Sequence, residues 1–130
     1  MTEIRIAGLR KSFGGQPALV DVALDAAPGE MVTLLGPSGC GKTTTLRCVA
    51  GFLAPDGGDI LVDGRSILDV PLRRRDFGVV FQNYALFPHM TAAENVAYGL
   101  RVRRIAAGEI ARRVAASLEE VGLTGYGDRL

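Results

Sequence analysis

The stretch LLGPSGCGKTTTL at residues 34–46 decides the fold, because a short apolar run enters a glycine-rich loop there. Gly36, Gly41, Lys42 and Thr43 match the spacing G-x-x-x-x-G-K-[ST] of a phosphate-binding loop. Glycines let the backbone curl until successive N–H groups point inward, and the start of a helix adds a partial positive charge. Chance produces this pattern at roughly one start position in 30,000. The stretch therefore predicts a strand, a phosphate loop and a helix, in that order.

The chemistry of the loop indicates a nucleoside triphosphate with Mg²⁺ as the ligand. Lys42 is expected to reach the β- and γ-phosphates as a point charge, and the Thr43 hydroxyl is a candidate Mg²⁺ ligand. The remaining loop positions are expected to line the same site: Pro37, Ser38, Gly39, Cys40 and Thr44. Cys40 is interpreted as a small residue whose side chain points away from the phosphates.

Periodicity predicts strands on both sides of this loop. Residues 3–9 and 18–26 alternate apolar and polar side chains, which indicates two half-buried strands in an antiparallel pair, with Val20, Val22 and Leu24 on one face. Residues 31–35 and 77–82 are short apolar runs, which are typical of strands buried on both faces. A further strand is predicted at 59–64.

Three helices are predicted from capping and apolar spacing. The first covers 42–51 with Gly51 as its C-cap. The second is opened by a capping box of Thr91 and Glu94 and runs to about Leu100. The third covers 108–123, with one apolar stripe of Ile110, Val114, Leu118 and Val121. The order predicts an α/β core followed by a helical part.

Composition narrows the function classes. The chain has 130 residues, one domain or less, and 48% of them are hydrophobic. A net charge of +1 gives no basic excess for nucleic acid. The sequence has neither a membrane-spanning apolar run nor an N-terminal secretory signal. Cys40 and Cys48 have no zinc-type spacing and are expected to be reduced thiols.

The loop motif alone also fits nucleotide kinases and GTPases. In those proteins the loop usually follows the first strand, whereas here two strands with antiparallel character come first. The guanine motif N-K-x-D does not occur in the sequence. The kinase alternative is therefore weak.

Four segments resemble the ATP-binding subunits of ABC transporters, and together they extend over almost the whole chain. They are KSFGG (11–15), GPSGCGKTTTLRCVAGFLAPDGGDILVDG (36–64), FGVVFQ (77–82) and FQNYALFPHMTAAENVAYGLR (81–101). The last has the form typical of importers for polyamines, ferric iron and related solutes. The resemblance implies a P-loop NTPase core with an N-terminal antiparallel β subdomain and the start of a helical subdomain, and it makes ATP the expected nucleotide.

The resemblance also implies roles for individual residues. Phe13 would stack on the adenine ring; the alternative is a core Phe in a turn. Gln82 would lie near Mg²⁺ and the attacking water, which makes it a catalytic and metal-ligand candidate beside Lys42 and Thr43; the alternative is a polar residue at a strand end. Residues 84–90 would lie near the surface that receives the transmembrane subunit, with His89 as a contact residue rather than a base. The arginines at 73–75 are interpreted as solvated.

The expected organisation follows from the same resemblance. Residues 1–82 would form the N-terminal part of the ATPase core, and residues 83–130 the Q-loop and the start of the helical subdomain. The expected partners are transmembrane permease subunits, a second ATP-binding subunit and, indirectly, an extracytoplasmic solute-binding protein. The expected location is the cytoplasmic face of the cell membrane.

The family's L-S-G-G-Q signature, Walker B aspartate, catalytic glutamate and switch histidine do not occur in the 130 residues. We therefore expect an incomplete domain that does not hydrolyse ATP alone. Two functional hypotheses remain: an importer ATPase subunit that couples hydrolysis to solute transport, and a truncated nucleotide-binding module without hydrolytic activity.

Overall fold

The computed structural model describes residues 2–130. The chain divides into two compact units, the first up to Val79 and the second from Val80 to Leu130. Each unit is described by itself below. None of the helices in residues 2–130 is long and apolar enough to cross a membrane.

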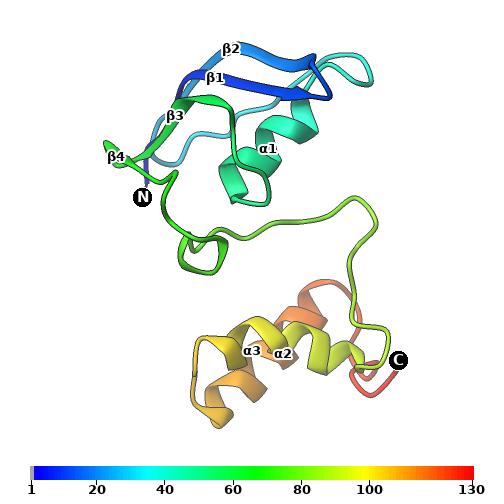
Figure 1. Cartoon of the computed structure of the whole chain (residues 1–130). Helices are drawn as coiled ribbons and strands as arrows, with labels where there is room; N and C mark the ends of the chain where they lie inside the picture. Colours follow the sequence, from blue (N-terminus) through cyan, green and yellow to red (C-terminus); the bar gives the residue numbers. More distant parts are fainter. Residues whose placement is uncertain (1) are drawn as a thin grey trace. The chain divides into compact units, whose positions relative to one another are not determined.

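The first unit is built on a four-stranded antiparallel sheet in the order β2-β1-β3-β4. The strands are β1 (Ile4–Phe13), β2 (Gln16–Ala26), β3 (Gly57–Val62) and β4 (Arg65–Ser66). The helix α1 (Lys42–Ala50) covers one face of the sheet (Figure 1). A short 3₁₀ helix, η1 (Leu72–Arg74), follows the last strand.

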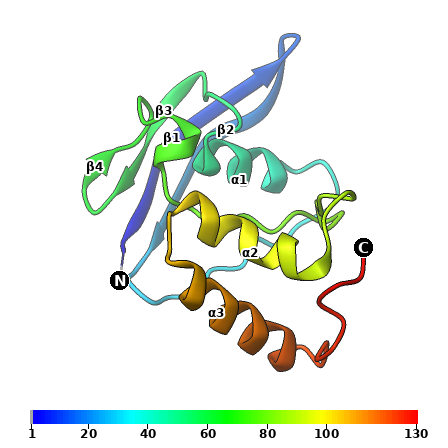
Figure 2. The same ribbon diagram turned by 90° about the horizontal axis from the view of Figure 1, so that it is seen from below.

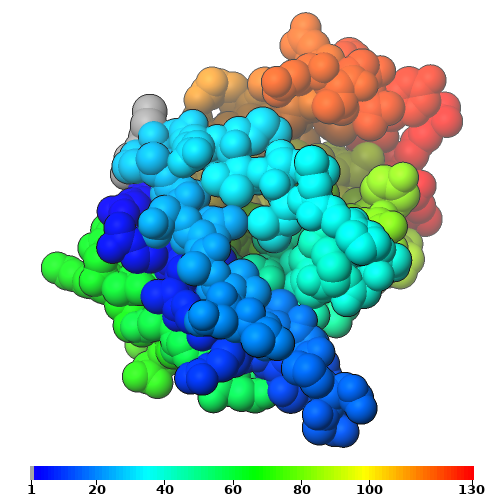
Figure 3. All heavy atoms as spheres, turned by 90° about the horizontal axis from the view of Figure 1, so that it is seen from above, coloured from blue at the N-terminus to red at the C-terminus, as the bar shows by residue number. Residues whose placement is uncertain are grey.

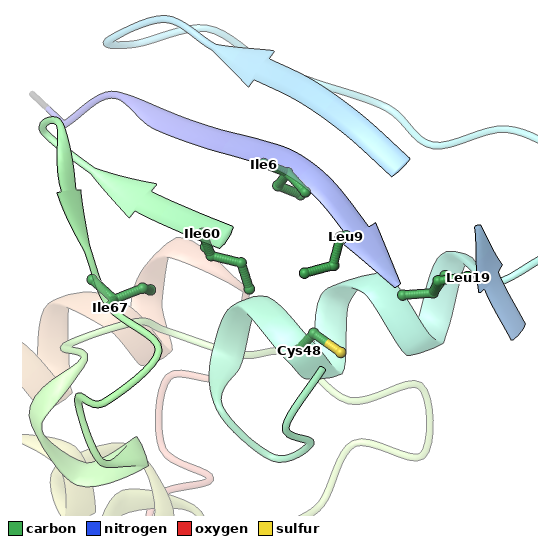
Figure 4. Close-up of a cluster of buried hydrophobic side chains, with 6 residues drawn as sticks. All are labelled: Ile6, Leu9, Leu19, Cys48, Ile60 and Ile67. Carbon is green, nitrogen blue, oxygen red and sulfur yellow. The ribbon is translucent and has the colours of Figure 1, made fainter. Parts of the chain in front are cut away.

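The core of this unit lies between the sheet and α1. Figure 4 shows its six buried side chains, which come from the three long strands, from α1 and from the residue after β4: Ile6, Leu9, Leu19, Cys48, Ile60 and Ile67. Because α1 contributes Cys48 to this cluster, burial of apolar surface holds the helix that follows the phosphate loop against the sheet.

The predicted antiparallel pair is confirmed, but one face assignment was wrong. Val22 and Leu24 are half-buried, whereas Val20 is 70% exposed and its neighbour Leu19 is buried instead. Asp21 has a φ of 52°, and the β1–β2 register shifts in this region. A bulge of this kind reverses the alternation of side chains, which a strict period of two cannot anticipate.

The two predicted buried strands at 31–35 and 77–82 are not strands, and this is a correction. Both segments are irregular, and Met31, Leu35 and Val80 are 92%, 87% and 97% exposed. A strand exists only through the hydrogen bonds of a neighbouring strand. No strand within residues 2–130 pairs with either segment, so their apolar composition does not produce a strand.

The second unit is a helical pair formed by α2 (Ala92–Val102) and α3 (Ala107–Glu120), which Figure 2 shows from below. The predicted capping box is confirmed: the Thr91 side chain accepts from Glu94 N, and the Glu94 side chain accepts from Thr91 N. Val114 and Leu118 are buried against Ala97, as the stripe predicted. Val121 lies beyond the end of α3 and is 66% exposed, so the stripe ends one turn earlier than predicted.

Candidate functional site

The phosphate loop connects the irregular segment after β2 to the first residue of α1. Gly36, Gly39 and Gly41 all have positive φ, at 154°, 83° and 95°. At Gly41 a Cβ atom would lie 2.7 Å from Leu19 Cδ2 and 2.8 Å from Ala18 O. No other residue fits there, because it would clash with the backbone of β2 and adopt a strained conformation. The glycine therefore allows the loop to pack directly against the sheet.

The N-terminus of α1 opens onto this loop. Gly41 is the N-cap and has no side chain to bond the helix, and the first turn contains no acidic residue. The first intrahelical bond is the one from Thr45 N to Gly41 O, at 2.8 Å. The N–H groups of residues 42–44 therefore precede the helical ladder and have no intrahelical acceptor. N–H groups at a helix N-terminus form an anion-binding site.

Lys42 folds back over the loop that precedes it. Its Nζ donates to Gly36 O and to Pro37 O, both at 2.7 Å, and lies 3.3 Å from Cys40 Sγ. The ammonium is thus held by neutral acceptors. An anion entering the loop would offer charged acceptors in exchange, and hydrogen bonds of that kind are stronger.

Cys40 and Thr43 also lie at this loop. Cys40 is exposed, and its Sγ lies on the side of the Lys42 ammonium. Thr43 is exposed in the first turn of α1, so its hydroxyl is accessible as an oxygen ligand. Residues 36–40 are all exposed, and Figure 3 shows the segment around them, in cyan, on the surface.

Phe13 lies apart from the loop, at the tip of the β1–β2 hairpin. It forms the last pair of that hairpin with Gln16, and its side chain is 51% exposed. The Lys11 Nζ lies over the ring at 5.8 Å from its centroid. A half-exposed ring is not a core residue, so the alternative interpretation of Phe13 was wrong.

Gln82 belongs to the second unit. It is exposed and lies in a turn, not at a strand end, so that alternative was also wrong. Its association with the phosphate loop stays a prediction.

Residues 84–90 form a loop attached to α2. Asn95 fixes it: its Oδ1 accepts from Phe87 N at 2.8 Å, and its Nδ2 donates to Phe87 O and Met90 O. A largely apolar cavity of about 540 Å³ adjoins this loop. Its lining includes Leu86, Phe87, Pro88, Met90, Val96, Leu118 and Tyr126. His89 does not line the cavity but packs edge-on against Phe87, with ring centroids 6.2 Å apart.

The sequence analysis interpreted Arg75 as solvated, together with Arg73 and Arg74. For Arg75 this interpretation was wrong. Its guanidinium is half-buried and donates to four backbone carbonyls. Two of these, Cys48 O and Val49 O, belong to the last turn of α1 and lie 2.9 Å away. Burial lowers the pKa of the Arg75 guanidinium. No local pattern distinguishes it from Arg73 and Arg74, because its acceptors are distant in sequence.

Comparison with known proteins places this site in a family. The sequence profile of the ABC transporter family matches residues 19–130. The chain belongs to the ABC transporter family. The resemblance inferred from the motifs is thereby confirmed.

Individual proteins with similar sequences agree with this family assignment. The chain is 50% identical to a spermidine/putrescine import ATP-binding protein from Methylococcus capsulatus, over 98% of this chain and 34% of the relative. It is 49% identical to an Fe(3+) ions import ATP-binding protein from Rhizobium etli, over 98% of this chain and 36% of the relative. The chain thus spans about a third of the length of the curated relatives it matches.

A solved structure confirms the fold class. The ATP-binding cassette MJ0796, determined as a dimer in a post-hydrolysis state with ADP and Pi, superposes with a TM-score of 0.83. Sequence identity is 26%, and the match covers 97% of this chain and 60% of that chain. The predicted P-loop core with an antiparallel β part and the start of a helical part is therefore correct.

Proposed function

We propose that this chain is the nucleotide-binding part of an ATP-binding subunit of an ABC importer. The observation that carries the proposal is the phosphate loop, which has positive φ at its three glycines and the Lys42 ammonium folded over it from the first turn of α1. Family membership makes ATP the nucleotide. The names of the relatives support polyamines or ferric iron as the imported solute, and they do not separate the two.

In this proposal the loop residues bind the triphosphate together. The residues from Gly36 to Thr44 surround the phosphates: Gly36, Pro37, Ser38, Gly39, Cys40, Gly41, Lys42, Thr43 and Thr44. Lys42 exchanges its carbonyl acceptors for β- and γ-phosphate oxygens and neutralises their charge. Phe13 stacks on the adenine through its open face.

Mg²⁺ fits the donors at this site. Residues 2–130 contain no cluster of three His, Cys, Asp or Glu side chains that could hold a metal alone. A Mg²⁺ ion here would be held by phosphate oxygens with Thr43, which matches its preference for oxygen ligands and waters. The ion would supply charge neutralisation for phosphoryl transfer, and Thr43 would orient it. Gln82 remains the second metal-ligand candidate, on the family resemblance alone.

We further propose the organisation expected from the family. Residues 1–82 form the nucleotide-binding part, and residues 83–130 form the Q-loop and the start of the helical subdomain. The apolar cavity beside residues 86–90 supports this loop as the contact with the permease subunits. A second ATP-binding subunit and a solute-binding protein complete the importer, which places the protein on the cytoplasmic face of the membrane.

The experiment is nucleotide binding to the 130-residue chain. With Mg²⁺ present, titration with a fluorescent ATP analogue and displacement by ATP should show saturable binding. Lys42→Ala should weaken it about 10-fold to 150-fold, because hydrogen bonds to charged groups contribute roughly 1.5–3 kcal/mol. Arg47→Ala, which removes an exposed cation from the same helix, is the control and should change little. Equal affinity of the wild type and Lys42→Ala would refute the proposal.

The truncated-module hypothesis differs from the importer hypothesis in stating that the chain binds ATP but does not hydrolyse it. We propose that the 130 residues bind ATP without turnover, because the family's water-activating residues are not among them. Phosphate release should not exceed the protein-free rate. Steady release that disappears in Lys42→Ala would contradict this.

A further inference from the structure

The hairpin tip that presents Phe13 is bonded to an acidic residue outside the hairpin. Asp56 lies on the connection between α1 and β3. Its Oδ1 accepts from Lys11 Nζ at 2.6 Å, and its Oδ2 accepts from Ser12 N at 2.7 Å. Its own N–H donates to Arg10 O at 2.8 Å. One residue thus binds three consecutive residues of β1, immediately before Phe13.

Lys11 connects this attachment to the aromatic ring. Its side chain is only 15% exposed, although it carries a charge, and its Nζ lies over the Phe13 ring at 5.8 Å from the centroid. This distance is within the range of a cation–π contact. Because 51% of Phe13 remains exposed, the ring keeps surface available for a stacking partner.

The surroundings of the ring show why such an attachment matters. Phe13 is followed directly by Gly14 and Gly15, both at positive φ, and a Cβ on either glycine would meet no atom within 4 Å. The two glycines therefore have no side chains that could pack against the ring. The hydrogen bond from Lys11 also lowers the pKa of the Asp56 carboxyl, which favours its ionised form as the acceptor.

We propose that Asp56 and Lys11 are positioning residues that fix the ring of Phe13 for the adenine base, and so set the base-dependent part of the nucleotide affinity. The inference rests on the proposed function, because it requires ATP at this site. The competing role is purely structural: the pair would only attach the hairpin to the α1–β3 connection, and its loss would affect every ligand equally.

The test compares two ligands that share their phosphates. ATP presents an adenine, whereas inorganic tripolyphosphate presents none. Dissociation constants for both, with Mg²⁺, are measured on the 130-residue chain for the wild type, Asp56→Asn, Lys11→Met and Phe13→Ala. Asp63→Asn is the matched control, because Asp63 also accepts from a backbone N–H of the same sheet, that of Glu3 at 2.9 Å, but lies in the β3–β4 turn.

We expect Phe13→Ala to weaken ATP about 5-fold to 150-fold, the usual range for loss of a base-stacking aromatic. Asp56→Asn and Lys11→Met should weaken ATP about 3-fold to 10-fold. Tripolyphosphate affinity should stay unchanged in all three, and Asp63→Asn should change neither ligand. In the Phe13→Ala background, Lys11→Met should have no further effect on ATP, because its action passes through the ring.

Any other pattern of affinities contradicts the inference. Equal weakening of ATP and tripolyphosphate would assign the pair a structural role, and unchanged ATP affinity would assign it none. A Lys11→Met effect that persists without Phe13 would show that Lys11 contacts the nucleotide itself. A wild-type chain that binds neither ligand would refute the proposed function, and the positioning role with it.

Discussion

Cys40 and Cys48 lie in opposite surroundings. Cys40 is exposed in the phosphate loop, whereas Cys48 is fully buried between α1 and the sheet. Burial raises the pKa of the Cys48 thiol, which lowers the fraction of reactive thiolate further. The two thiols therefore report on different parts of the first unit.

From this difference we predict selective alkylation. Iodoacetamide should label Cys40 at least 10-fold faster than Cys48, as measured by peptide mass spectrometry over time. Mg-ATP should slow the labelling of Cys40, because nucleotide phosphates would occupy the loop beside it. Mg²⁺ without nucleotide is the control and should give no protection. Equal rates at the two cysteines, or no protection by ATP, would contradict the prediction.

At the scale of single residues, the sequence predicted the phosphate loop but not the contacts that Asp56 and Arg75 make. The spacing of Gly36, Gly41 and Lys42 was sufficient because the phosphate-binding conformation depends on residues that are adjacent in the chain. Asp56 and Arg75 could not be found in the same way. The partners of Asp56 lie up to 46 residues away in the sequence, and those of Arg75 up to 27 residues away, so only the fold brings them together.

The last turn of α1 depends on Arg75. The guanidinium donates to two carbonyls of this turn, Val49 O and Cys48 O, and also to Leu68 O and Val70 O. Cys48 O accepts from the C-cap Gly51 N as well. Arg75→Met keeps much of the apolar stem and removes these bonds. We expect it to lower the unfolding free energy of the first unit by about 1–3 kcal/mol.

Two measurements test this prediction. Chemical denaturation gives the unfolding free energy, and hydrogen exchange of the α1 amides shows whether the helix itself is destabilised. Arg75→Lys should recover part of the loss, because an ammonium can reach fewer of the four carbonyls. Arg73→Met is the control: Arg73 is exposed in η1, and its replacement should change stability by less than about 0.5 kcal/mol. If Arg75→Met and Arg73→Met behave alike, Arg75 does not hold the helix.

The helix α3 carries a pH-dependent ion cluster in its first turns. Glu109 accepts from Arg112 and Arg113, at 2.7 and 2.6 Å, and these hydrogen bonds, Arg112 first, lower its pKa from 4.5 to about 2. A carboxyl whose pKa is lowered by folding stabilises the folded state fully above its unfolded value. This contribution is lost as the pH falls from about 4.5 to about 2.

We therefore expect the wild type to lose helical signal more steeply between pH 5 and pH 2 than Glu109→Gln does. Far-UV circular dichroism across this range gives the comparison. Glu120→Gln, at the other end of α3, should follow the wild type. Identical pH profiles for the wild type and Glu109→Gln would show that the cluster does not contribute.

Among the elements, the helices and the antiparallel strands were predictable and the two apolar segments were not. The capping box at Thr91 and Glu94 and the C-cap at Gly51 act locally, so the sequence determines them. The segments 31–35 and 77–82 have the composition of buried strands, but a strand also needs a neighbour to pair with. Whether a pairing strand is present depends on the whole sheet, and the composition of one segment does not predict it.

The whole chain exposes much of its apolar surface. Within residues 2–130, the first unit has a core cluster of six buried residues and the second unit has one of three. Large apolar side chains are exposed both before the phosphate loop and at the start of the second unit, with Met31 at 92%, Leu35 at 87% and Val80 at 97%. Small cores give small cooperative units, and exposed apolar segments promote association.

We predict that the 130-residue chain associates and does not melt as one cooperative unit. Near-UV circular dichroism should show no sharp transition above about 45 °C, the low end for mesophile domains. Sedimentation velocity should show association that increases with concentration. Replacing Met31 and Val80 with lysine should shift the sample toward monomer, because charge at the exposed segments opposes their contact. Gln16→Lys, which adds the same charge at an exposed polar residue, is the control and should leave association unchanged. A monomeric wild type with a sharp transition above that temperature would contradict the prediction, because the exposed segments would then have no effect on either property.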